Sequence, residues 1–214
     1  GTGVTIDTNG GDLDFAGGDI AIQTGPAAVL RSQGGGTNAI FRGDTPARTI
    51  GVGVGATAAN VDLSEAELQT VDATFANIVI GATGQTGNVT VDDNSSLVLN
   101  NTNLVVYVDG AGAALTQTED TPIDLSGGAG HAVTINGNGA GADPTSLGAN
   151  ILTQGGAVTI DDAVVLADTT ADLVTIDTTI GAAGGANVVF DPSSGGGTVN
   201  GSANDTQQLT INAG

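Results

Sequence analysis

The residues of this chain with the clearest chemical potential are pairs of neighbouring carboxylates. Ca²⁺ favours several oxygen ligands from carboxylates and backbone carbonyls, so acidic pairs at turns are candidate calcium ligands. The tandem nonapeptide of calcium-binding β-rolls is missing, and its nearest copy, residues 127–135, has His131 where that motif has Asp. Alternatively, outward-facing Asp side chains simply keep strands soluble. We expect no cofactor, with Ca²⁺ left open at four weak candidates: Asp92, Asp93, Asp161 and Asp162.

Side chains for catalysis are scarce. The single histidine, His131, lies in a glycine-rich stretch, whereas a general base needs an orienting partner. The chain has no Cys, no Lys and no Gly-x-Ser-x-Gly nucleophile motif. Two carboxylates alone can hydrolyse a glycoside, but Tyr107 is the only Tyr and Lys is absent, so the chain has few residues for a sugar-cleaving groove. We predict no catalytic residues and no enzymatic activity.

The charge is strongly unbalanced. The chain has 23 Asp and Glu residues against three Arg, and its formal net charge is −20. A surface of this kind repels nucleic-acid phosphates and anionic lipid headgroups. No apolar stretch reaches the roughly 18 residues of a membrane-spanning helix. We therefore expect neither nucleic-acid binding nor membrane insertion.

The three arginines, Arg31, Arg42 and Arg48, all lie in the segment 26–60. One interpretation is an interface in which this segment contacts the acidic face of a neighbouring unit and propagates a head-to-tail filament. The alternative, which we favour, is pairing with nearby carboxylates of the same chain.

One four-residue sequence motif, called the phrase below, recurs along the chain. It predicts how the residues discussed above are positioned. Each copy alternates aliphatic with polar residues, as in a half-buried strand. Glycine-rich turns separate the copies, and such repetition favours a parallel solenoid over an antiparallel sandwich. At roughly 20 residues per rung, the chain would make about ten rungs. The copies are Val4-Thr5-Ile6-Asp7, Val89-Thr90-Val91-Asp92, Val133-Thr134-Ile135-Asn136, Val158-Thr159-Ile160-Asp161, Val174-Thr175-Ile176-Asp177 and Leu209-Thr210-Ile211-Asn212.

The remaining organisation is simple. Ser64-Glu65-Ala66-Glu67 has the form of a capping box and predicts one short helix near 64–72. We expect residues 1–214 to form one solenoid segment, in which 26–60 is a less regular excursion. Polar runs at Asn94-Ser95-Ser96 and Asn100-Asn101-Thr102 are candidates for side-chain amide ladders at the corners. The two ends would join as strand, turn and strand, so we expect a fragment or repeat unit that continues into another unit, covalently or by docking.

Two passages resemble filamentous-haemagglutinin-like bacterial surface proteins. They are Asp62-Leu63-Ser64-Glu65-Ala66-Glu67-Leu68-Gln69-Thr70-Val71, followed by Ile78-Val79-Ile80-Gly81, and the stretch from Leu152-Thr153-Gln154 to Val164-Val165-Leu166. The resemblance covers most of 60–214 and implies a right-handed parallel β-helix exported to the cell surface. It also implies use as an adhesin or matrix fibre, with no active site on the repeats. We therefore expect an extracellular structural stalk or fibre-forming segment; the alternative is an adhesin that binds a receptor or glycan through 26–60.

Overall fold

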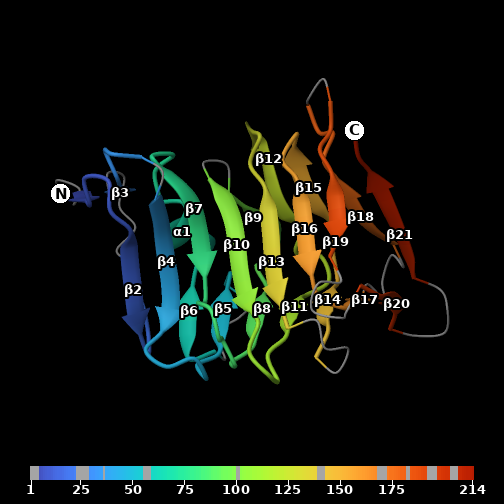
Figure 1. The fold of residues 1–214 in the computed structure, drawn as a ribbon, viewed down its shortest axis with the longest axis horizontal. Helices are drawn as coiled ribbons and strands as arrows, with labels where there is room; N and C mark the ends of the chain where they lie inside the picture. The colour runs from blue at the N-terminus through green and yellow to red at the C-terminus, as the bar shows by residue number, and fades with distance from the viewer. Residues whose placement is uncertain are drawn as a thin grey trace.

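The computed structural model of the chain describes residues 5–22, 29–35, 37–54, 59–99, 102–138, 143–167, 173–181, 184–191, 197–202 and 207–214. In these residues the chain forms 21 strands, β1 to β21, and one helix, α1, of four residues. The strands lie side by side along the molecule, with β2 and β3 near one end of its longest axis and β21 near the other (Figure 1). The predicted all-β class is confirmed.

Most strands belong to three sheets, and every ladder between strands is parallel. The first sheet contains, in spatial order, β19 (Val188–Phe190), β16 (Val158–Asp161), β13 (Val133–Gly137), β10 (Asn103–Val108), β7 (Phe75–Ile80), β4 (Thr37–Gly43) and β2 (Leu13–Gly17). The second contains β20 (Val199–Gly201), β17 (Val164–Leu166), β14 (Thr145–Leu147), β11 (Leu115–Gln117), β8 (Val89–Val91), β5 (Ile50–Val52) and β6 (Val61–Leu63). The third contains β21 (Gln208–Asn212), β18 (Leu173–Asp177), β15 (Ile151–Gln154), β12 (Ile123–Ala129) and β9 (Leu97–Val98).

From β7 onward the chain visits the first, second and third sheets in turn, and each strand pairs with the strand three places later. Leu104 pairs with Val133 and Val133 with Val158, which are 29 and 25 residues apart. The predicted ten rungs of about 20 residues are therefore wrong, because the longest described sheets have seven strands. A coil that crosses three sheets needs three strands and three turns, which takes more residues than we expected.

The remaining strands, β1 (Thr5–Asp7) and β3 (Val29–Arg31), pair with each other, and Leu30 of β3 also bridges Val71 in parallel. In chain order, β1, β3 and Val71 directly precede β2, β4 and β7 of the first sheet, as the strands of the third sheet precede later ones. We call β1, β3, Val71 and the third sheet together the third face. Val71 and β9 are successive members of the third face. Between them, the side-chain amide of Gln69 donates to the carbonyl of Val98 in β9 over 3.0 Å.

The alternating phrase forms strands as predicted, because one side of each strand faces the interior. In β13, Val133 and Ile135 are fully buried and Thr134 between them is half-buried. Equivalent side chains stack between coils: Val106, Ile135 and Ile160 occupy successive strands of one register. The copies do not share one column, however, since Thr90 lies in the second sheet, Thr134 and Thr159 in the first, and Thr175 and Thr210 in the third.

The regular winding is interrupted between β5 and β7. The chain leaves β5 at Gly53, where φ is +98° and a Cβ would lie 2.4 Å from the Asp92 carbonyl oxygen. It then returns as β6 on the side of β5 away from β8. Helix α1 (Glu65–Leu68) follows with the predicted capping box, because Ser64 and Glu67 bond each other's backbone N–H. The helix is shorter than the predicted 64–72, and the segment 26–60, expected as an excursion, contains β3, β4 and β5 of the stack.

Candidate interaction surfaces

In the part of the chain that the structure describes, the outermost strands at both ends of the stack pair on one side only, and some of their apolar side chains are exposed. At the N-terminal end all three residues of β1 are exposed, and Ile6 keeps 40% of its surface. At the C-terminal end Ile211 keeps 44%, and Val189 and Val199 are also exposed. Ile211, Ile6 and Val199 continue buried columns, since they pair with Ile176, Leu30 and Val164 respectively, whereas Val189 pairs with the half-buried Thr159.

The arginines predicted as interface candidates are each paired with an aspartate of the same chain. Arg31 Nε lies 2.9 Å from Asp7 Oδ2, Arg42 Nε 2.9 Å from Asp14 Oδ1, and Arg48 Nε 2.8 Å from Asp44 Oδ1. The first two pairs join neighbouring strands, because Asp7 is opposite Arg31 in the β1–β3 ladder and Asp14 lies in β2 beside β4. Arg48 beside Asp44 lowers the pKa of that carboxyl. This is the arrangement of the favoured alternative; an intermolecular role for these residues stays a prediction.

The candidate calcium ligands do not converge. Each adjacent pair is divided by the alternation of side chains: Asp92 and Asp161 are half-buried, whereas Asp93 and Asp162 are buried. Asp93 Oδ1 accepts from Val54 N over 2.9 Å. Asp162 Oδ2 accepts from the Thr145 hydroxyl over 2.9 Å, and burial raises the pKa of this carboxyl. Among the residues that the structure describes, no three His, Asp or Glu side chains are placed to share a metal ion, and calcium binding stays a prediction.

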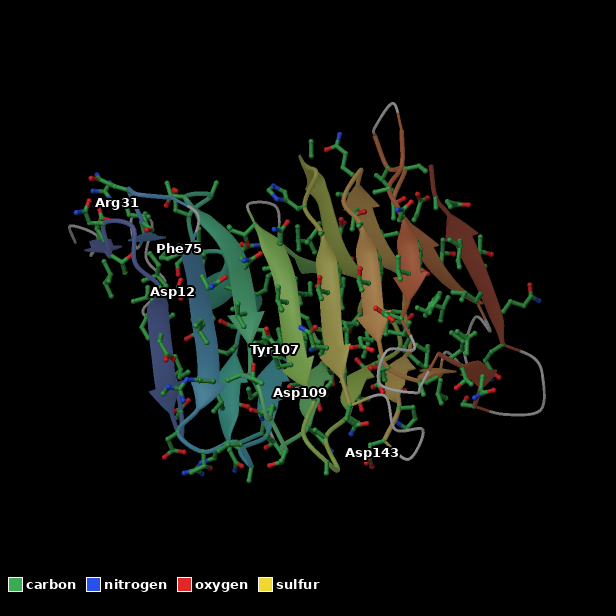
Figure 2. All side chains as sticks on the ribbon, in the orientation of Figure 1. Asp12, Arg31, Phe75, Tyr107, Asp109 and Asp143 are labelled. Carbon is green, nitrogen blue, oxygen red and sulfur yellow. The ribbon has the colours of Figure 1, made fainter. Side chains whose placement is uncertain are left out.

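An outer hollow of about 270 Å³ lies on the first sheet, over β4, β7 and β10. Its floor is a row of aliphatic side chains, Ile40, Val79 and Val105, with Tyr107 at one side (Figure 2). Asn38 and Asn77 line it as well, and none of its lining residues is charged. An uncharged hollow with one aromatic ring is unusual on a chain of net charge −20.

Comparison with protein-family models, with curated proteins and with solved structures finds no match for this chain. The resemblance to filamentous-haemagglutinin-like proteins stays a prediction. In the described residues, no helix is long and apolar enough to cross a bilayer.

One structural feature escaped the sequence analysis: a ladder of side-chain amides on the outside of the first sheet. Asn77 donates to Asn38 over 2.7 Å, Asn103 donates to Asn77 over 3.0 Å, and the Asn103 oxygen accepts from Ala132 N over 2.9 Å. The predicted ladders were elsewhere, at 94–96 and at 100–102, of which Asn100 and Asn101 lie outside the described residues. The ladder joins three coils and forms one wall of the hollow.

Proposed function

We propose that this chain is a non-catalytic, extracellular structural segment of a bacterial surface stalk or matrix fibre. Its three sheets would wind as a right-handed parallel β-helix that continues along its axis into further units. The observation that carries the proposal is the state of the two ends: among the described residues, the outermost strands pair on one side only, and Ile6 and Ile211 each leave an apolar column open. Such edges are templates for another strand, and solenoids usually cover them with polar caps.

The charge distribution supports growth along the axis rather than sideways. Residues 1–50 contain five Asp and three Arg, whereas residues 51–214 contain eighteen acidic residues and neither Arg nor Lys. Most of the lateral surface is therefore acidic and repels its copies, while the N-terminal end is close to neutral. A C-terminal end approaching an N-terminal end meets less repulsion than two C-terminal ends do.

Sedimentation and electron microscopy of the purified chain test this function. We expect concentration-dependent rods that are one chain wide and several chains long, and longer rods at higher ionic strength because salt screens the acidic surfaces. Short monodisperse particles at every concentration would refute axial continuation by docking. Antibody labelling of intact bacterial cells that produce the protein should reach the epitope without permeabilisation.

The outer hollow supports a second candidate, an adhesin for a neutral glycan. One of the three strands that line the hollow is β4, which belongs to the segment 26–60 expected to bind a ligand in the adhesin alternative. Tyr107 offers a ring face, and the Asn38 and Asn77 amides offer polar contacts, without a charge to select an ionic ligand. On an array of neutral glycans, Tyr107→Ala should abolish saturable binding, whereas Thr134→Ala on the same sheet should not. Equal binding by both variants would dismiss this candidate.

A further inference from the structure

The two ends do not match strand for strand, and the mismatch lies on the third face. The first sheet contributes seven strands per copy. Each of them follows a third-face member: β1, β3, Val71, β9, β12, β15 and β18 in that order. A further strand, β21, pairs with β18. Among the described residues, the third face therefore has eight members and the first sheet has seven strands.

This excess decides how a second copy can dock. If β19 of one copy pairs with β2 of the next, the first sheet continues without a gap. The third face then has a single position at the junction for two strands, β21 of one copy and β1 of the next. If both strands stay, the first sheet is left with an empty position between the copies.

The two competing strands are interchangeable in sequence. Leu209-Thr210-Ile211-Asn212 and Val4-Thr5-Ile6-Asp7 have matching residue types in the same order, although Val4 lies outside the described residues. Ile6 is opposite Leu30, and Ile211, with nearly the same exposure, could be buried against the same Leu30. The strand β21 is the better anchored of the two, with five register pairs to β18 against three between β1 and β3.

The last residues of the two strands, Asp7 in β1 and Asn212 in β21, can make similar hydrogen bonds. In the chain as it stands, Asp7 accepts from Arg31 Nε over 2.9 Å, and Asn212 Nδ2 donates to Asp177 Oδ2 over 3.0 Å. An asparagine has both a donor and an acceptor. With β21 in the β1 position, Asn212 could keep its bond to Asp177 and offer Oδ1 to Arg31 of the next copy.

Resting on the axial association proposed above, we propose that β21 of one copy displaces β1 of the next copy and pairs with its β3. Exchange of an equivalent element is a low-cost route to association. The exchanged filament repeats every seven strands, an axial rise of about 34 Å, whereas stacking with both strands retained requires eight, about 38 Å.

A matched pair of full-length variants, Ile211→Asp and Ile6→Asp, tests the exchange by sedimentation. Both substitutions place a carboxylate at an end position of similar exposure. Exchange predicts that Ile211→Asp raises the concentration for half-assembly about tenfold or more, because the carboxylate would be buried. Ile6→Asp should leave that concentration unchanged or lower it, because β1 leaves its position in the filament.

Engineered cysteines test the register, since the chain has no native Cys. We expect Thr210→Cys chains mixed with Val29→Cys chains to form disulfide-linked dimers on oxidation, because Val29 is opposite Thr5 in the β1–β3 ladder. Linkage to Thr5→Cys in place of Val29→Cys would overturn the exchange and indicate stacking with both strands retained.

The outcomes separate the two proposals. Filaments that both variants abolish, or that repeat at about 38 Å, would overturn the exchange and leave the structural function in place. Filaments that neither variant affects would overturn docking through this face. A wild-type chain that stays monomeric at all concentrations and ionic strengths would overturn both the exchange and association by docking.

Discussion

The column of isoleucines in the third sheet allows the same substitution to be compared in the interior and at an end. Ile151, Ile176 and Ile211 occupy successive strands in register. The first two are fully buried, and Ile211 is 44% exposed. We predict that Ile151→Ala destabilises the chain several times more than Ile211→Ala does.

The magnitude follows from what each side chain contacts. Ile151 is enclosed by its own coil and by a strand on either side, so truncation removes buried methyl groups and leaves a cavity, at a cost of about 3 kcal/mol. Ile211 has a neighbouring strand on one side only and already contacts solvent, so the same truncation should cost about 1 kcal/mol or less.

Urea unfolding followed by far-UV circular dichroism measures both values, at protein concentrations below the assembly threshold. Ile176→Ala serves as the control and should match Ile151→Ala, because its side chain is equally buried. Costs for Ile151→Ala and Ile211→Ala that agree within about 0.5 kcal/mol would refute a column that is open at its C-terminal end.

Three further predictions concern polar groups. Asp162→Asn should raise the melting temperature at neutral pH, because burial raises the folded-state pKa of Asp162 above its ordinary value of 3.8. The wild type therefore loses stability as pH rises from about 3.8 through that raised pKa. The variant cannot titrate at this position and should lack this part of the pH profile. Glu67→Ala should cost about 2 kcal/mol in urea unfolding, because Glu67 accepts from the backbone N–H groups of Ile22 and Ser64, while Glu67→Gln should cost less by keeping one acceptor oxygen. Asn77→Ala should cost about 1 to 2 kcal/mol by breaking both steps of the amide ladder. Asn60→Ala, which removes the side-chain oxygen that accepts from Thr49 N, should cost about half as much, and equal costs would contradict a coupled ladder.

The strands and the capping box could be predicted because both depend on residues close in sequence. Val133 and Ile135 are separated by one residue, and their common face follows from the pleat alone. Ser64 and Glu67 are three residues apart, within reach of one helical turn. The parallel arrangement was predicted from repetition of the phrase, and two pairs of copies do lie side by side, Val133 beside Val158 and Val174 beside Leu209.

The features that sequence reasoning missed depend on which coil lies beside which. Asn38, Asn77 and Asn103 form a ladder although they are 39 and 26 residues apart, because the interruption between β5 and β7 lengthens one coil. The carboxylate pairs looked alike in sequence, yet alternation directs Asp162 inward to Thr145 and leaves Asp161 half-buried. The number of coils was overestimated because the phrase occurs in all three sheets.

The same alternation that builds the interior also leaves apolar side chains exposed at the two ends of the described stack. An alternating strand has one apolar face, and in the interior that face is covered by the coils on both sides, as Val133 is by Leu104 and Val158. At an end, one of those coils is missing, so Ile6 and Ile211 are left exposed by the same pattern that buries Ile135. Unprotected edges of this kind would ordinarily promote disordered aggregation. In the axial association proposed above, the acidic lateral surface would oppose sideways contacts and contacts between two C-terminal ends. Apolar columns would then provide the attraction, and the distribution of charge would direct it to contacts that include the nearly neutral N-terminal end.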